Sequence, residues 1–208
     1  YACLLCTAVG GDPFGEEGVD VLLGDSDDAW LVKATSQKRE DLLAKYKEFF
    51  SAATANEWNV LRTEAENKLK ADLKVDNAGP RLGELFEDDI WETVSRKCLG
   101  CGACSYLCPT CYCFDLTDRK TGKGSEKIRR WDCCMFPLFT RHASGHNPRS
   151  IGAARLRQRI MHKFSYFMET YGVSSCVGCG RCVRRCPVNL DIREALTEVL
   201  AAGIPARK

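Results

Sequence analysis

The chain has 208 residues, of which 45% are hydrophobic and 28% charged, enough to bury one or two cores. Its formal net charge of +2 lacks the basic excess typical of nucleic-acid-binding proteins. Fourteen cysteines, with no signal peptide and no apolar run that could span a membrane, indicate metal ligands and reduced thiols in an anaerobic cytoplasm. A start at Tyr1 instead of Met fits a piece of a longer protein.

Residues 1–34 are predicted to be the end of an N-terminal α/β domain. Apolar runs at 19–23 and 29–32 flank the turn-forming segment Gly24–Asp28, a pattern that predicts a β-hairpin. Seven acidic residues and no basic residue lie between positions 12 and 28. They indicate a solvated face, with a docking surface as the alternative.

Residues 35–96 are predicted to form a helical section that carries no chemistry. Apolar residues three and four apart predict a first helix, with Leu42, Leu43, Tyr46, Phe49 and Phe50 in the core. Thr54 and Glu57 form a capping-box pattern before a second helix that reaches Leu73. The segment Asn77–Pro80 is read as a stop, and a third helix follows through Val94.

Two cysteine motifs dominate the remaining domain, residues 97–208. The segment Cys98–Pro109 reads CLGCGACSYLCP, and Cys176–Pro187 reads CVGCGRCVRRCP. Both follow C-x2-C-x2-C-x3-C-P, the spacing of cubane ligation in two-cluster ferredoxins. There the first three cysteines surround one [4Fe–4S] cluster, whereas the fourth binds the other cluster.

The sequence therefore predicts two [4Fe–4S] clusters with crossed ligation. The first cluster takes Cys98, Cys101, Cys104 and Cys186, and the second takes Cys176, Cys179, Cys182 and Cys108. Glycines between the cysteines let the backbone approach each cluster. Zinc and disulfides are the alternatives, but zinc does not need a fourth cysteine followed by proline, and disulfides are awkward at such close spacing.

The segment between the motifs is read as mainly helical. A polar turn is expected at 118–125, and a helix from about 151 to 170 with Ile160, Phe164, Phe167 and Met168 inward. Asp191 and Glu194 are predicted to cap a last helix. These helices favour a mainly α fold, an α-helical ferredoxin-like domain with a small N-terminal α/β remnant. Twelve Lys or Arg between 119 and 163 favour partner docking.

Several further residues have open roles. The remaining cysteines are read either as ligands of a third cluster or as buried thiols: Cys3, Cys6, Cys111, Cys113, Cys133 and Cys134. Cations beside the motifs either raise the cluster potentials, orient a partner, or solvate the surface: Arg96, Lys97, Arg181, Arg184 and Arg185. The histidines His142, His146 and His162 are expected to be structural. No pattern for substrate turnover or nucleotide binding is evident, so no catalytic residue is assigned.

Four segments occur in this order along the chain: CLGCGACSYLCPTCYCFD, RRWDCCMFPLFTRHASGHNPR, RLRQRIMHKFSYF and CVGCGRCVRRCPVNLDI. Over roughly residues 97–193 the chain resembles the iron–sulfur β subunit of soluble, NAD(P)-linked [NiFe] hydrogenases (sulfhydrogenases), and equally the A-type subunit of anaerobic sulfite reductase. Residues 1–34 are similar to the end of that family's N-terminal domain. Leu4-Leu5-Cys6 stands there in place of the usual C-F-C, with Cys3 displaced.

The resemblance implies a non-catalytic relay subunit of an oxidoreductase complex. A flavin subunit would handle NAD(P)H or a similar donor, and a hydrogenase or sulfite reductase subunit would perform the chemistry. Two alternatives are a free-standing ferredoxin that diffuses between enzymes and a redox sensor read out by cluster loss. Crossed ligation argues against the sensor because it makes a cluster hard to lose.

Overall fold

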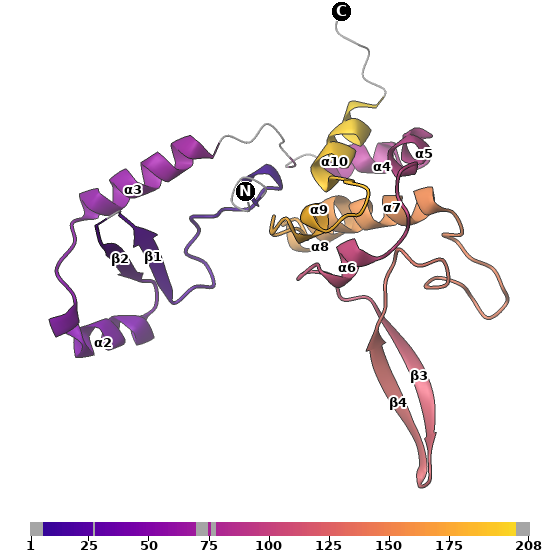
Figure 1. Cartoon of the computed structure of the whole chain (residues 1–208), viewed down its shortest axis with the longest axis horizontal. Coiled ribbons are helices and arrows are strands. Elements are labelled where there is room, and N and C mark those ends of the chain that lie inside the picture. Colours follow the sequence, from indigo (N-terminus) through magenta and orange to yellow (C-terminus); the bar gives the residue numbers. More distant parts are fainter. Residues whose placement is uncertain (1–5, 27, 70–74, 76–77, 203–208) are drawn as a thin grey trace, which may run out of the picture. The chain divides into compact units, whose positions relative to one another are not determined.

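The computed structural model describes residues 6–26, 28–69, 75 and 78–202 (Figure 1). The chain divides into two compact units, one made of Tyr1–Gly11 and Ala71–Lys208 and the other of Asp12–Lys70. Both cysteine motifs lie in the larger unit. The predicted domain boundaries after residues 34 and 96 stay a prediction. No described helix has the length and hydrophobicity that a bilayer crossing requires.

The smaller unit starts with the predicted hairpin, which is confirmed. Strand β1 (Val21–Asp25) pairs antiparallel with β2 (Trp30–Ala34). Helices α2 (Gln37–Lys45) and α3 (Ala55–Lys68) follow, with a 3-10 turn at Lys47–Phe49 between them. The predicted capping box is present at the start of α3.

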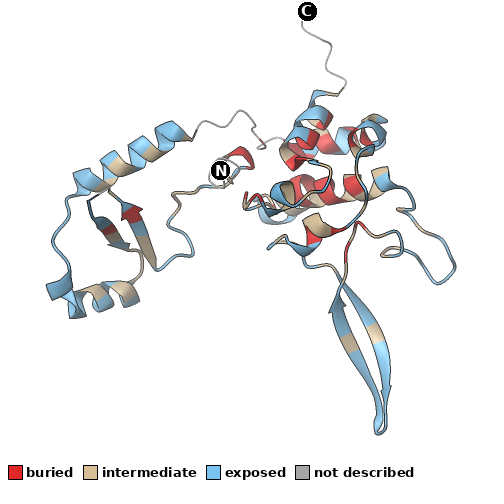
Figure 2. Cartoon of the chain, in the orientation of Figure 1, coloured by how far each residue is buried: buried red, intermediate tan, exposed pale blue. Residues whose placement is uncertain are grey.

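The predicted core of the first helix is wrong. No residue of α2 or α3 is buried, and Leu42, Tyr46, Phe49 and Phe50 are exposed (Figure 2). The periodic pattern predicts the helix correctly, but among the described residues of this small unit nothing buries that face. The second helix ends at Lys68, and its predicted continuation to Leu73 falls outside the described residues.

The core of the larger unit is built by four helices. They are α4 (Ala78–Glu84), α5 (Ile90–Ser95), α7 (Gly152–Met161) and α10 (Ile192–Ala201), which pack on one another. The predicted single helix over 82–94 is therefore two short ones. Ala78–Pro80 starts a helix instead of stopping one, and Pro80 is tolerated in its first turn.

The helix predicted over 151–170 is confirmed, with one irregular turn. A π-helical turn at His162–Tyr166 joins α7 to α8 (Phe167–Tyr171). Ile160 and Phe164 are fully buried, as predicted, whereas Phe167 and Met168 are only partly so. Single π turns often occur at functional sites, and this one carries a buried lysine, Lys163.

The last helix is capped as predicted by Asp191, whose side chain accepts a hydrogen bond from the Arg193 N–H at 2.8 Å. Burial opposes ionisation of Asp191. The side-chain and backbone hydrogen bonds from Arg193 outweigh it and lower the pKa of the carboxyl group.

The segment between the motifs also contains a β-hairpin, so it is only partly helical and the prediction of a mainly helical segment was wrong for residues 114–131. Strand β3 (Phe114–Thr121) pairs antiparallel with β4 (Gly124–Trp131), from Phe114↔Trp131 to Thr121↔Gly124. Of the polar turn predicted at 118–125, only Gly122 and Lys123 lie between the strands, and the other residues are paired in β3 and β4. A mainly α class is therefore not confirmed, because helices and two small antiparallel sheets together form the described chain. Figure 1 shows this hairpin projecting away from the helices of its unit.

Candidate metal centre

The two cysteine motifs fold in the same way. Gly100 and Gly102 have φ of 67° and 76°, and Gly178 and Gly180 have 62° and 71°. Each second glycine precedes a four-residue helix, α6 (Ala103–Tyr106) or α9 (Arg181–Arg184), and these two helices pack together. Left-handed backbone favours glycine at these positions. The sequence repeat is thus a structural repeat.

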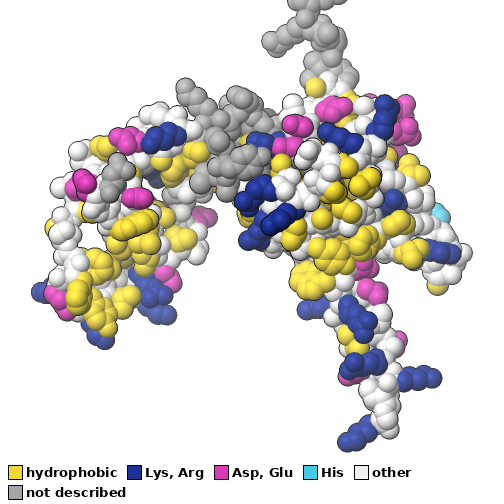
Figure 3. Space-filling view, viewed as in Figure 1, with side chains coloured by type: hydrophobic (Ala, Val, Ile, Leu, Met, Phe, Trp, Pro, Cys, Tyr) yellow, Lys and Arg dark blue, Asp and Glu magenta, His cyan; other side chains and the backbone are white. Residues whose placement is uncertain are grey.

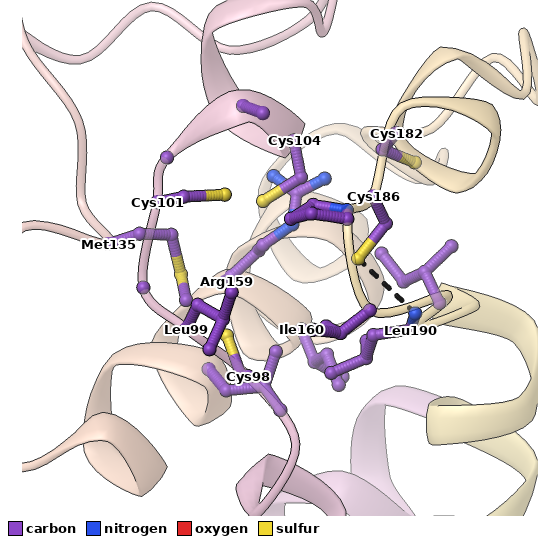
Figure 4. A pocket seen from close by; sticks show the side chains of 17 residues that line it. Cys98, Leu99, Cys101, Cys104, Met135, Arg159, Ile160, Cys182, Cys186 and Leu190 are labelled. Atoms are coloured by element: carbon purple, nitrogen blue, oxygen red, sulfur yellow. Dashed lines mark hydrogen bonds between the residues drawn. The ribbon is translucent and has the colours of Figure 1, made fainter.

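Cysteines from both motifs line one cavity. Cys98, Cys101 and Cys104 of the first motif share it with Cys186 of the second (Figure 4). Cys182 also lines this cavity. Most of the other lining side chains are apolar, among them Met135, Leu156, Ile160, Val188 and Leu190. The structure therefore brings together the four thiols assigned to the first cluster.

Backbone N–H groups point at sulfur in this region. The Leu190 N–H donates to Cys186 Sγ at 3.2 Å, and Figure 4 shows this bond at the edge of the cavity. The Gly178 N–H donates to the Cys176 sulfur. Such amide contacts stabilise negative charge on cluster sulfur.

The cysteines assigned to the second cluster influence one another electrostatically. Burial raises the pKa of Cys182, and the nearby thiolates of Cys108 and Cys179 raise it further. Burial likewise raises the pKa of Cys176, with added repulsion from Cys182 and Cys108. Lys163 Nζ contacts Cys108 Sγ at 3.3 Å and also the carbonyl of Ser175, the residue before Cys176, at 2.8 Å. Cys108 therefore lies near the start of the second motif.

Two buried cations lie against these sulfurs. Arg159 is 4% exposed and Lys163 is 1% exposed. Lys163 Nζ donates to the Ser175 carbonyl at 2.8 Å, Thr110 Oγ1 at 3.1 Å and Cys108 Sγ at 3.3 Å. Arg159 lines the first cavity and its guanidinium donates to the Cys182 sulfur. Within the described part of the chain, neither cation pairs with a carboxylate.

The charges at the site respond to this arrangement. Burial raises the pKa of Cys104 to about 11, although Arg159 opposes the shift. A hydrogen bond from the Cys111 thiol, with help from Lys163 and Thr110, lowers the pKa of Cys108 to about 3 against the effect of burial. Burial would lower the pKa of Arg159, but the surrounding cysteine sulfurs raise it. The site is built to hold negative charge.

These residues fit an iron–sulfur cluster better than the two alternatives. No disulfide joins any of the cysteines from Cys98 to Cys186. No three Cys, His, Asp or Glu side chains of the described residues are gathered tightly enough to hold a single metal ion. The first four thiols instead surround a cavity, and thiolates, amide N–H groups and buried cations are what an anionic cluster requires.

Some predicted site residues lie elsewhere. Arg96, Lys97, Arg181, Arg184 and Arg185 are exposed and do not line the cavity. His142 and His146 are exposed and pack on each other, with ring centroids 5.3 Å apart. The buried cations Arg159 and Lys163 were missed. Their signal was a pair of cations four apart beside Ile160 and Phe164, on the inward face of a predicted helix.

Comparison with known proteins identifies the class of this site. Residues 97–190 match the family model described as a 4Fe-4S dicluster domain. This part of the chain is therefore similar to 4Fe–4S dicluster domains, the class that the cysteine spacing predicts.

A particular relative is similar along most of the chain. It is the sulfhydrogenase 2 subunit beta of Pyrococcus furiosus, 32% identical over 198 residues, which are 93% of this chain and 58% of the relative. The predicted resemblance to the sulfhydrogenase β subunit is thus confirmed. The chain spans little more than half the length of that curated relative. No solved structure matches the chain.

Proposed function

We propose that the chain is the electron-relay subunit of a multi-subunit cytoplasmic oxidoreductase. Two [4Fe–4S] clusters, when bound, would accept and pass on single electrons. Cys98, Cys101, Cys104 and Cys186 would hold the first cluster, and Cys176, Cys179, Cys182 and Cys108 the second. A flavin or NAD(P)-type subunit would stand on one side, and a hydrogenase or sulfite reductase catalytic subunit on the other.

The observation that carries this proposal is the shared cavity. Cys186 lies 82 positions beyond Cys104 in sequence numbering and still lines the cavity with the first motif's three leading cysteines. Cys182, on α9, lines it as well. Ligand sets that interlock in this way keep both clusters close, which is the condition for electron transfer between them.

The chain's own residues would set how easily these clusters accept electrons. Arg159 and Lys163 supply two positive charges inside the protein, where water does not screen them. A buried positive charge stabilises the reduced, more negative form of a neighbouring cluster and so raises its reduction potential. The apolar wall of the first cavity excludes water from that site.

The exposed apolar face of the β3–β4 hairpin is evidence that another subunit binds there. Phe114, Leu116 and Trp131 are 46%, 60% and 69% exposed, and the pairs Phe114↔Trp131 and Leu116↔Arg129 place them on one face. Figure 3 shows Lys and Arg side chains along the same hairpin. A two-stranded hairpin is only marginally stable by itself. We therefore assign it as a docking arm for another subunit.

Anaerobic purification tests the proposal. The dicluster motifs should hold about eight irons and eight acid-labile sulfides per chain. Reduction with dithionite should give the EPR signal of two interacting clusters. Native extracts should yield the chain together with a flavoprotein and a larger redox subunit. Clearly fewer than about eight irons, or zinc in their place, would overturn the proposal.

The second candidate, a free-standing ferredoxin, makes a different prediction. A diffusing carrier would be found as a monomer in native extracts, and removal of the hairpin would not change its distribution. The exposed apolar face of the hairpin favours the complex. Recovery of the full-length protein only as a monomer would favour the carrier.

A further inference from the structure

A second cavity, of about 360 Å³, lies beside the dicluster site in the larger unit. None of the eight proposed cluster ligands lines it. Three other cysteines and three basic residues do: Cys111, Cys113, Cys134, Arg149, Arg159 and Lys163. Cysteines and cations line a cavity together where a protein binds an anionic metal cluster, so this cavity has the composition of a further cofactor site.

The three thiols belong to one interacting group, although they come from two segments. The exit of the first motif supplies Cys111 and Cys113, and the segment after β4 supplies Cys134. The Cys134 thiol hydrogen-bonds to the Cys113 sulfur, and this bond lowers the pKa of Cys113 to about 7 and raises that of Cys134. Cys111 interacts electrostatically with Cys113. Three sulfurs thus meet at the cavity.

The same buried cations serve both sites. Arg159 lines the first cavity and the second. Its Nη1 donates to Ser105 Oγ at 3.3 Å and to Cys111 Sγ at 3.6 Å. Lys163 lines the second cavity and contacts Cys108, a proposed ligand of the second cluster. Burying two cations without a carboxylate is costly. Anionic groups on both sides of them remove that cost.

We propose that the second cavity holds a third iron–sulfur cluster, bound by the thiolates of Cys111, Cys113 and Cys134. His162 lines the same cavity, and its imidazole offers the fourth donor. The third cluster extends the proposed relay and rests on that proposal, since the shared cations place it next to the dicluster site. The neighbouring Cys133 does not line this cavity. It is fully buried, and the Met135 N–H donates to its sulfur at 3.4 Å.

Iron and sulfide counts on the full-length, anaerobically purified protein test this proposal. The wild type should contain two to four irons more than the eight of the dicluster motifs. Cys113→Ser with Cys134→Ser should lose these additional irons and one EPR signal, and should keep about eight. Phe139→Leu, which changes the same cavity without removing a sulfur, should keep all of them.

The outcomes separate this proposal from the previous one. A wild type with about eight irons, unchanged in the double cysteine variant, would overturn the third cluster and leave the relay intact. One zinc in place of the additional irons would overturn it as well. A wild type with clearly fewer than about eight irons would overturn the dicluster assignment itself. Retention of eight irons in the variant shows that the variant has folded.

Discussion

Lys163 offers the sharpest test of how the protein controls its clusters. Its ammonium group is 1% exposed and lies 3.3 Å from the sulfur of Cys108, a proposed ligand of the second cluster. Lys163→Met removes the charge and retains most of the side-chain volume. Because the reduced cluster carries one more negative charge than the oxidised cluster, the loss of this cation should lower the reduction potential.

The size of the effect follows from Coulomb's law. At an effective dielectric constant of about 20 and a separation of about 6 Å, one added electron and the ammonium charge attract by roughly 2.8 kcal/mol. For a one-electron couple, a tenfold change in the equilibrium constant, about 1.4 kcal/mol, shifts the reduction potential by about 59 mV. Lys163→Met should therefore lower the potential of one cluster by on the order of 100 mV.

An anaerobic EPR-monitored redox titration of the complete protein measures this shift. Lys163→Arg keeps the charge, so its reduction potential should differ from that of the wild type by less than about a quarter of the shift expected for Lys163→Met. Lys127→Met, on the exposed hairpin, should leave both potentials in place because water and salt screen its charge. Equal potentials in Lys163→Met and the wild type, at full iron content, would refute the assignment of Lys163 as a buried counter-charge.

Three further predictions concern folding and assembly. Gly102→Ala should destabilise the holoprotein by about 1–2 kcal/mol and so lower its thermal unfolding temperature, because φ is +76° and the new Cβ would lie 2.8 Å from the Phe136 ring. Gly83→Ala, in open space on α4, should not lower the unfolding temperature. Asp191→Ala should cost about 1 kcal/mol as a lost helix cap. Since the pKa of Asp191 is lowered in the folded protein, the difference in stability between the wild type and this variant should be constant from pH 8 to about 5 and be lost only as the pH falls below about 4. A difference in stability that grew on acidification would contradict the lowered pKa. Trp131→Ala should weaken capture of partner subunits at least about tenfold and leave the iron content unchanged, whereas unchanged capture would remove the hairpin from the interface.

The candidate site could be read from the sequence because cluster ligation leaves a local pattern. Cysteine spacing, the glycines between the cysteines and the final proline are constrained within twelve residues, and both copies obey them. The prediction that the fourth ligands cross rests on the motif occurring twice. The capping box at Thr54 and the cap at Asp191 were predictable for the same local reason.

Features that depend on tertiary contacts were harder to predict. Arg159 and Lys163 look like solvent-facing cations of an amphipathic helix, and only the placement of cysteines from distant segments shows what their charges meet. The β3–β4 hairpin was missed since its exposed strands are rich in charged residues and lack the apolar alternation of a half-buried sheet. The apolar stripe of α2 predicted a helix correctly, but periodicity does not show what covers it.

Crossed ligation is the central claim, and one set of variants tests it most directly. Cys176→Ala with Cys179→Ala should remove the second cluster and about four irons, while the first cluster stays. In that background, Cys186→Ser should remove about four further irons, and Cys108→Ser should remove none. The opposite result, in which Cys108→Ser empties the first motif and Cys186→Ser does not, would show that each motif binds its own cluster and would contradict the account.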